Sequence, residues 1–218
     1  RFSSPSWRSA SGISAAMQKK SGTWVERSRQ WMRMDERQQA MVTIREARES
    51  DAPALIKLRK TLFEETQFLL LEPEEYNPGI ESETGFIRMF EQSENSAIFL
   101  ALNSESSLLG FMGVAGGNTN RSRHNANIFM GILREYWGKG IGQRLFDKLF
   151  EWVTTTEIVR LELTTAVNND RAYSLYKKMG FEQEGIKKAH INLQGKLVDE
   201  YMMYYLTTNI DKFTGDSK

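Results

Sequence analysis

The sequence contains no cysteine and only two histidines, His124 and His190. The lack of cysteine excludes disulfides, thiolate nucleophiles and thiolate metal ligands, and it fits a reducing compartment such as the cytoplasm. Two histidines leave little material for a histidine-based zinc site or a Ser-His-Asp triad. Any catalytic chemistry is therefore expected to depend on carboxylates, tyrosines, backbone groups or a cofactor, without a metal.

Two further absences concern partners. The 29 basic and 28 acidic side chains give a net charge of +1, which lacks the basic excess typical of a nucleic-acid-binding protein. No apolar run approaches the roughly 20 residues needed to cross a bilayer. The longest, Phe63–Leu71, is interrupted by Glu64, Glu65 and Gln67. We therefore expect neither a nucleic-acid nor a membrane partner.

The first 39 residues differ in composition from the rest of the 218-residue chain. They are rich in Ser, Arg and Lys, have almost no acid before Glu26, and do not begin with methionine. A fragment end, a tag, a translated upstream region or an organellar transit peptide would each have this composition. We expect a poorly ordered leader over 1–39, which includes a short helix over 24–34. A folded domain is expected over 40–210, followed by a tail over 211–218.

The periodicity of the remaining residues predicts an α/β domain. The expected strands cover 42–47, 97–105, 107–117, 124–133, 159–167, 181–190 and 200–206, and the expected helices cover 51–63, 85–92, 145–153 and 172–179. The order β-α-α-β-β-β-α-β-α-β-β mixes hairpins with crossovers, so the sheet should be mixed and not fully parallel.

A glycine-rich turn lies between a predicted strand and a predicted helix. The apolar run Ile128–Leu133 leads into it, the glycines fall within 138–142, and helical apolar spacing continues to Val153. Glycines let backbone N–H groups converge on an anion at a helix N-terminus, so this pattern is typical of a phosphate site. The P-loop template fails because Gly140 follows the lysine, and the dinucleotide template fails at Gln143. A glycine-rich connection without a ligand remains an alternative.

Two blocks carry a more specific signal: FMGILREYWGKGIGQRLFDKL, and LELTTAVNNDRAYSLYKKMGFEQEG after it. Together they resemble the GCN5-related N-acetyltransferases (GNAT), in the bacterial branch that acetylates small amines, polyamines or protein N-termini. The first block resembles the family's pyrophosphate loop, Q/R-x-x-G-x-G/A, with Trp137 at the leading basic position. The second matches N-x-x-A-x-x-L-Y-x-K-x-G-F from Asn169 to Phe181. The resemblance covers roughly Val42 to Leu206.

The resemblance implies a GNAT-like acyl-CoA N-acyltransferase fold of about seven strands. The strands over 128–133 and 159–167 are expected to run parallel and to splay apart at one end, where the pantetheine arm of CoA fills the gap like a missing strand. The implied function is acetyl-CoA-dependent transfer of an acetyl group to a primary amine by direct attack in a ternary complex. The protein is expected to be a monomer or a homodimer.

The same resemblance assigns the cosubstrate contacts. Ile132 and Leu133 present backbone groups to pantetheine, and the Leu133 N–H is the expected oxyanion donor. Asn169 is expected to contact CoA besides capping a helix, with a plain N-cap as the alternative. The residues expected to cradle the pyrophosphate are Gly138, Lys139, Gly140, Ile141, Gly142, Gln143 and Arg144, in which Lys139 is either a phosphate contact or a solvated lysine.

Tyr176 matches the family's general acid near the CoA sulfur, and its alternative role is packing of a helix onto the sheet. The general base is less defined by the sequence. Glu162 lies in mid-strand among apolar residues, where a carboxylate needs a partner or a role, either as the base or in a structural ion pair. Some relatives carry the base two residues later, where this chain has Thr164. The reserve candidates are Asp199, Glu200 and the acidic residues between Glu64 and Glu83.

The stretch from Glu64 to Glu83 contains seven glutamates and no lysine or arginine. It forms either a solvated acidic surface or an acidic lip that attracts a cationic acceptor. Two hypotheses from other classes also stay open. One is a CoA-binding sensor or interaction module without turnover, and the other is nucleic-acid binding through the basic leader.

Overall fold

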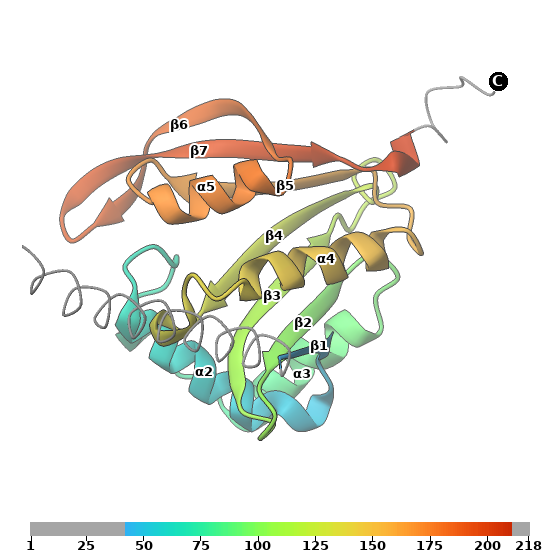
Figure 1. Cartoon of the computed structure of the whole chain (residues 1–218), viewed down its shortest axis with the longest axis vertical. Coiled ribbons are helices and arrows are strands. Elements are labelled where there is room, and N and C mark those ends of the chain that lie inside the picture. Colours follow the sequence, from blue (N-terminus) through green and yellow to red (C-terminus); the bar gives the residue numbers. More distant parts are fainter. Residues whose placement is uncertain (1–41, 211–218) are drawn as a thin grey trace, which may run out of the picture. The chain divides into compact units, whose positions relative to one another are not determined.

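The computed structural model describes residues 42–210, so the leader, the helix expected over 24–34 and the tail lie outside the described residues. Within 42–210 the elements follow the predicted order (Figure 1). They are β1 (Thr43–Glu46), α2 (Ala52–Glu65), α3 (Ile80–Glu91), β2 (Ala97–Leu102), β3 (Leu108–Gly116), β4 (Asn125–Ile132), α4 (Ile141–Val153), β5 (Arg160–Ala166), α5 (Asp170–Lys178), β6 (Glu182–Leu193) and β7 (Lys196–Leu206).

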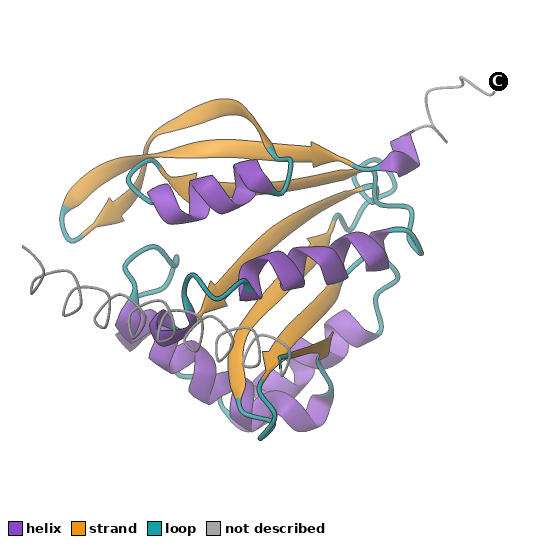
Figure 2. Ribbon diagram, in the orientation of Figure 1, coloured by secondary structure: helices purple, strands orange, loops and turns teal. Residues whose placement is uncertain are grey.

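The strands form one seven-stranded sheet in the order β1-β2-β3-β4-β5-β7-β6. β4 and β5 are parallel, and the other neighbouring strands in this sheet are antiparallel. The prediction of a mixed sheet is confirmed. The parallel pair requires a crossover connection, and α4 supplies it between β4 and β5 (Figure 2).

Helices cover the two faces of the sheet through separate hydrophobic clusters. On one face α4 packs through Phe146 against Leu161 of β5 and Tyr176 of α5. On the other face α2 and α3 pack through Leu55 and Ile87 in the second cluster. Alternate residues of a strand point to opposite faces, so neighbouring residues of β5 belong to different environments. This alternation determines which side chains of neighbouring strands can meet on one face of the sheet.

Helix α3 and the final hairpin are longer than the sequence analysis predicted. α3 begins at Ile80 and not at 85, because Gly79 is an extended N-cap and Gly85 is tolerated on the exposed side of the helix. One consequence corrects the acidic stretch: Glu83 is buried and bonds Arg59 at 3.0 Å, so it is not part of an acidic surface. The hairpin of β6 and β7 closes tightly because Gln194 and Gly195 both adopt positive φ.

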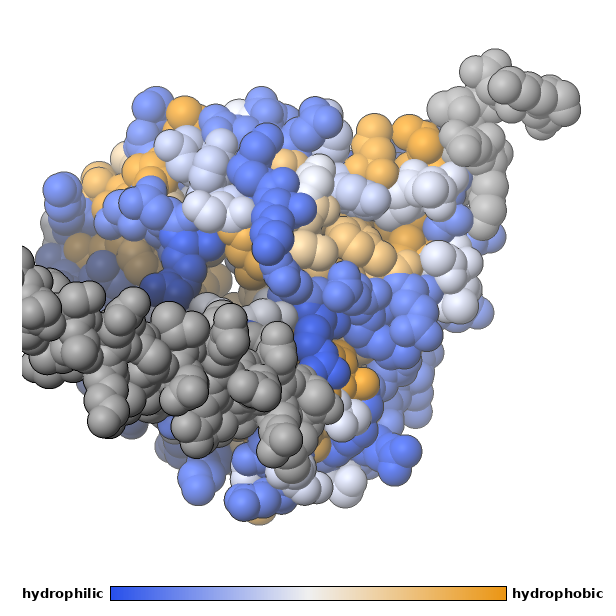
Figure 3. All heavy atoms as spheres, in the orientation of Figure 1, coloured by the Kyte–Doolittle hydropathy of each residue, from blue (hydrophilic) through white to orange (hydrophobic). Residues whose placement is uncertain are grey.

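β4 and β5 pair over only three residues and then separate. The paired positions are Asn125 with Arg160, Ala126 with Leu161, and Asn127 with Glu162. Beyond them the two strands diverge, as Figures 1 and 2 show. In the space-filling view a narrow opening lies between the part that carries α5 and the part that carries the start of α4 (Figure 3). The predicted splayed pair is confirmed. No helix within 42–210 combines the length and apolar character that spanning a membrane requires.

Candidate active site

The hydrogen-bond phase of β4 determines which of its backbone groups face the gap. In an antiparallel ladder, every second residue exchanges both of its bonds with the neighbouring strand. The Leu133 N–H donates to the carbonyl of Leu109 at 2.9 Å, and the Asn125 carbonyl accepts from Gly117 at 2.9 Å, so the odd-numbered residues of β4 bond to β3. Met130 and Ile132 therefore direct their backbone groups away from β3, into the gap.

The phase of β5 follows from its bonds to β7. The Thr207 N–H donates to the Val159 carbonyl at 2.8 Å, and the Val167 N–H donates to the Asp199 carbonyl at 3.0 Å. The backbone groups of the odd-numbered residues of β5 therefore bond to β7, and the backbone N–H and C=O of Thr164 face the gap. Both borders of the gap thus present peptide groups that an extended ligand could pair with, as an added strand does.

This phase corrects the expected role of Leu133. Its N–H is held by β3 and points away from the gap, so the expectation that it stabilises the acyl oxyanion is wrong. The N–H of the preceding residue, Ile132, has the required direction. The Ile132 carbonyl also faces the gap, and there it accepts a hydrogen bond from Trp137 Nε1 at 2.7 Å.

The glycine turn adopts the backbone conformation that the sequence predicted. Gly138 and Gly140 have φ of 75° and 77°, and Gly140 is the N-cap of α4. A Cβ built at either position meets nothing within 4 Å, so the space over the turn is open to a ligand. Gly142 differs, because a Cβ there would lie 2.7 Å from the Leu175 side chain. Its role in the described structure is to let α4 and α5 pack closely.

The other residues of the expected phosphate cradle occupy the start of α4. Ile141 is buried in the core, whereas Gln143 and Arg144 are half-buried in the first turn of the helix. Lys139 Nζ lies 5.1 Å from the centroid of the Tyr136 ring, a cation–π distance that keeps the ammonium group near the turn. Contacts of these residues with a phosphate stay predictions.

Asn169 is the N-cap of α5, which confirms the capping role that was expected of it. Its side-chain oxygen accepts a hydrogen bond from the Ala172 N–H at 3.3 Å. The first turn of the same helix carries Arg171, whose guanidinium carbon lies 4.7 Å from the centroid of the Trp137 ring. The beginnings of α4 and α5 therefore lie close together across the gap. Contact of Asn169 with CoA stays a prediction.

Tyr176 is buried on the face of the sheet that α4 and α5 cover. Its ring packs edge-on against Phe146 and tilted against Phe181, with centroids 6.0 and 6.2 Å away. Burial raises the pKa of the Tyr176 phenol to about 12, because the phenolate would lose its hydration. The group is therefore protonated at neutral pH and able to donate. The packing role is observed, and the role as general acid stays a prediction.

Glu162 lies at the last paired position of β4 and β5, on the sheet face opposite Tyr176. Its Oε2 accepts a hydrogen bond from Arg160 Nε at 3.1 Å, and Arg160 also bonds Glu184 at 2.6 Å. The structural ion pair that was the alternative to a catalytic role is therefore present. Thr164, two residues along the same face, has an exposed side chain at the border of the gap. A role for Glu162 as base stays a prediction.

The two reserve carboxylates lie next to each other on β7 but in different settings. Asp199 accepts hydrogen bonds from Lys188 Nζ and from the Ala189 N–H, both at 2.8 Å. These bonds hold the pKa of its carboxyl below the usual range. Glu200 is buried, with its Oε2 2.6 Å from Nδ1 of His190.

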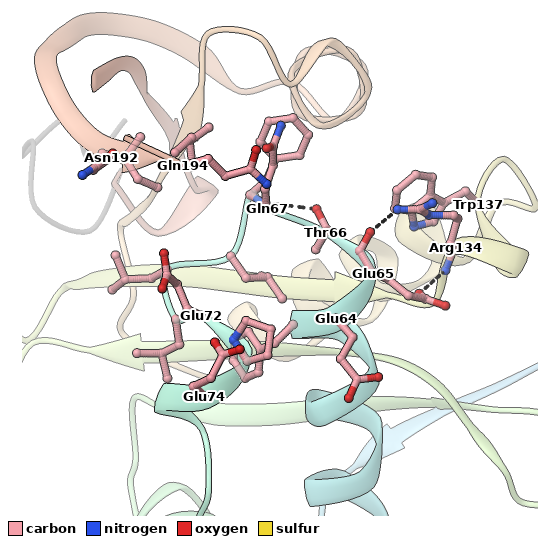
Figure 4. A pocket seen from close by; sticks show the side chains of 18 residues that line it. Glu64, Glu65, Thr66, Gln67, Glu72, Glu74, Arg134, Trp137, Asn192 and Gln194 are labelled. Carbon is pink, nitrogen blue, oxygen red and sulfur yellow. Dashed lines mark hydrogen bonds between the residues drawn. The ribbon is translucent and has the colours of Figure 1, made fainter. Parts of the chain in front are cut away.

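An acidic pocket of about 620 Å³ lies beyond the end of β4. Its described lining comes from the last turn of α2 and the segment after it, from the turn at Arg134 and Trp137, and from the tip of the hairpin of β6 and β7. Figure 4 shows Glu72 and Glu74 on one side of it and Asn192 and Gln194 on another. Four lining residues are glutamates and one is arginine, so the pocket favours a cation.

Parts of this pocket were missed by the sequence reasoning. The hairpin tip was expected only as a turn, and neither Asn192 nor Gln194 belongs to a motif that could have revealed it. Arg134 was missed as well, although it follows the strand end directly. Its backbone N–H donates to Glu65 Oε2 at 2.8 Å, and its guanidinium bonds the Glu65 carbonyl (Figure 4). These bonds fix the C-terminal end of α2 to the end of β4.

Comparison with known proteins gives two kinds of match. N-alpha-acetyltransferase RimI of Mycobacterium tuberculosis is 29% identical over 106 residues, which are 48% of this chain and 63% of that protein. Spermidine N(1)-acetyltransferase of Vibrio cholerae is 26% identical over 109 residues, 50% of this chain and 62% of that protein. The match thus spans less than two thirds of either relative. An acetyltransferase of the GNAT family from Streptococcus pneumoniae has a similar structure, with a TM-score of 0.73 and 29% identity over 76% of this chain and 99% of that chain.

A family model also matches residues 62–181, more than half of the chain, and it is described as the acetyltransferase (GNAT) family. This range begins in the last turn of α2 and contains the diverging strands, the glycine turn and α5. The chain belongs to the acetyltransferase (GNAT) family.

Proposed function

We propose that this protein transfers the acetyl group of acetyl-CoA to a primary amine on a cationic acceptor. The observation that carries the proposal is the divergence of β4 and β5 after Asn127 and Glu162. It leaves peptide groups facing a gap that begins near the open glycine turn and lies next to an acidic pocket. A phosphate-bearing, extended cosubstrate and an amine would thus approach from two sides.

The cosubstrate would be held mainly by main-chain groups. The turn over 138–142 offers N–H groups at the N-terminus of α4, where a helix favours an anion. The gap-facing peptide groups of Met130 and Thr164 suit the amides of pantetheine. Side-chain charge near the turn comes from Lys139 and Arg171 and would substitute for the family's basic residue, which is Trp137 here.

Acetyl transfer needs an oxyanion donor and an acid for the leaving sulfur. Of the gap-facing main-chain donors, the Ile132 N–H lies next to Leu133, and we assign it the role expected of that residue. Tyr176 supplies the proton for the thiolate, because its raised pKa keeps the phenol protonated until strongly alkaline pH. Attack by the amine requires no covalent intermediate, which agrees with a sequence that lacks cysteine.

The acidic pocket supports a cationic acceptor. Glu64, Glu72 and Glu74 are exposed at the pocket, and no ion pair joins any of them to a lysine or arginine of the described residues. A linear polyamine would place one ammonium group among these carboxylates and another amine at the gap. One relative is named a spermidine acetyltransferase and another an N-alpha-acetyltransferase, so a polyamine and a peptide N-terminus are the two acceptors to compare.

An acceptor screen tests the proposal. Purified protein is incubated with acetyl-CoA and spermidine, spermine, an aminoglycoside or an alanine-terminated peptide. CoA release is measured together with a mass gain of one acetyl group on the acceptor. Binding of acetyl-CoA is measured separately by calorimetry. We expect both products with a polyamine. Binding without turnover on any amine would favour the alternative of a CoA-binding sensor, and lack of binding would refute both.

A further inference from the structure

We propose that His190, oriented by Glu200, is the general base that deprotonates the acceptor amine. The inference rests on the proposed acetyl transfer and adds to it the group that the sequence left undefined. Its basis is a contact of 2.6 Å between His190 Nδ1 and Glu200 Oε2, in which the Glu200 side chain is 11% exposed and the His190 side chain is 46% exposed. A buried carboxylate thus holds an imidazole that is open to solvent.

The contact determines which ring nitrogen is available. A carboxylate can only accept a hydrogen bond, so Nδ1 must carry the proton that is shared with Glu200. Nε2 then has a free lone pair and can accept a proton from an ammonium ion. A carboxylate that fixes the tautomer and stabilises the imidazolium plays the same part in other histidine bases.

A bulge in β6 positions His190 over Glu200. Lys187 pairs with Glu200 and Ile191 pairs with Val198, so β6 contains extra residues between these two points. Ala189 within this bulge has φ of 49°. Its strain is offset by Asp199, which accepts hydrogen bonds from the Ala189 N–H and from Lys188. Bulges redirect side chains and occur often beside active sites, and this one directs the imidazole onto the neighbouring strand.

His190 and Glu200, here called the dyad, lie level with the open part of the gap. β4 and β5 are unpaired beyond Asn127 and Glu162, and the same sequence offset counted along the diverging strands matches Ile132 with Val167. On the other side of β5, Ala166 pairs with Glu200. Glu200 is therefore level with the open part of the gap but one strand beyond β5, and His190 lies beside it on β6, the next strand.

The dyad also lies on the side from which the acceptor would come. Tyr201 packs against Tyr173 of α5 at 4.9 Å, so its neighbour Glu200 points to the opposite face, the face of Glu162. Ile191, the residue after His190, lines the acidic pocket. His190 and Glu200 themselves lie outside the described lining, so the proposal requires the reacting amine to extend past Ile191 to the imidazole. Tyr176 would serve the sulfur from the other face.

The proton and bond changes balance without a further reactant. His190 Nε2 takes one proton from the alkylammonium group, which leaves a neutral amine. The amine nitrogen forms a bond to the acyl carbon, and the carbon–sulfur bond breaks. Tyr176 gives its proton to the departing sulfur and regains one from the acylated nitrogen, and His190 returns its proton to water. The charged groups around the imidazole are Glu200 and Asp199 on β7, and Lys187 and Lys188 on β6.

The test compares His190→Gln with His124→Gln. These are the two histidines of the chain, and His124 precedes β4 at the paired end of the parallel strands, away from the gap. We expect His190→Gln to lower kcat about 100-fold at pH 7 with unchanged acetyl-CoA affinity. The deficit should shrink as the pH rises toward the pKa of a free alkylamine, near 10, where the acceptor is already neutral. His124→Gln should keep the rate and its pH dependence.

Glu200→Gln provides a second, independent readout. An amide can donate to Nδ1 and so place the ring proton on Nε2, which removes the base without removing the imidazole. We expect a loss of kcat of at least tenfold and the same rescue at alkaline pH. If both variants bind acetyl-CoA, unfold at the wild-type temperature and keep the wild-type pH profile, His190 is not the base. If the wild-type protein releases no CoA with any amine, the proposed function fails instead.

Discussion

Trp137 Nε1 donates a hydrogen bond to the Ile132 carbonyl at 2.7 Å, across the turn that follows β4. The indole thereby satisfies one of the peptide groups that border the gap. The guanidinium carbons of Arg134 and Arg171 lie 5.6 and 4.7 Å from its ring centroid. Trp137 replaces a basic residue of the family's loop, so in this chain the positive charge near the turn is carried by its neighbours.

This bond predicts the effect of Trp137→Phe. An arm of pantetheine that pairs with the Ile132 carbonyl must displace the indole N–H, and a typical hydrogen bond contributes about 1 kcal/mol. Removal of the indole N–H, which competes with pantetheine for this carbonyl, should therefore lower the Kd for acetyl-CoA about fivefold, measured by calorimetry. Acetyl-CoA should also change the tryptophan fluorescence of the wild type but not of Trp137→Phe. Trp152→Phe, in the core against Phe99, should keep the fluorescence response, and weaker binding by Trp137→Phe would contradict the displacement.

Tyr176→Phe separates catalysis from packing. Phenylalanine keeps the ring contacts with Phe146 and Phe181, but it has no proton to give to the thiolate. We expect kcat to fall about 100-fold, with little change in the Kd for acetyl-CoA. Tyr173→Phe, on the same helix, is the matched control and should keep the rate. An unchanged kcat in Tyr176→Phe would leave this residue with a structural role alone.

The same substitution should change stability at alkaline pH. A tyrosine ionises near pH 10 in an unfolded chain, whereas burial raises the pKa of Tyr176 to about 12 in the fold. The unfolded state therefore loses its proton first, and stability falls as the pH rises from about 10 to 12. Chemical denaturation at pH 8 and pH 11 should show a larger loss for the wild type than for Tyr176→Phe. Equal losses would mean that the buried phenol does not contribute.

The element order was predictable because its signals are local, whereas the splayed strands were expected only from the resemblance to the GNAT family. Alternating and helical periodicities identify the elements, and positive φ at Gly138 and Gly140 follows from their place between a strand and a helix. The start of α3 was predicted late because Gly85 was read as a boundary. The structure has that glycine inside an exposed helical turn, where the cost of glycine is about 1 kcal/mol and packing elsewhere offsets it.

The chemistry of individual groups was less predictable because it depends on contacts between distant segments. The direction of the Leu133 N–H is decided by its ladder with Leu109, and a shift of one residue reverses it. His190 and Glu200 are ten residues apart on different strands, and the bulge that joins them has no local sequence signature. The sequence does not distinguish Glu83 from the neighbouring glutamates, and only the fold shows that it is buried in an ion pair with Arg59.

Gly140→Val tests the turn as the phosphate site. Valine at φ of 77° is strained by about 1–3 kcal/mol, and its side chain would enter the open space over the turn. We expect acetyl-CoA affinity to fall at least tenfold. Gly195→Val has matching strain, with φ of 84° and open space around it, at the tip of the final hairpin. That control should lose similar thermal stability but keep acetyl-CoA affinity, and equal affinity losses would assign the effect to misfolding.

Neutralising the pocket tests its preference for a cation. Glu72→Gln and Glu74→Gln remove two exposed carboxylates from the lining. Exposed ion pairs contribute modestly, so each change should raise KM for spermidine about two- to fivefold while kcat stays near the wild-type value. Added salt should reduce the difference between wild type and variants, because it screens the attraction. Glu81→Gln neutralises a glutamate of the same acidic stretch that lies on α3, outside the described lining. Glu81→Gln should leave KM for spermidine unchanged. If neither Glu72→Gln, Glu74→Gln nor added salt changes KM, the acceptor is neutral, such as a peptide N-terminus in its unprotonated form.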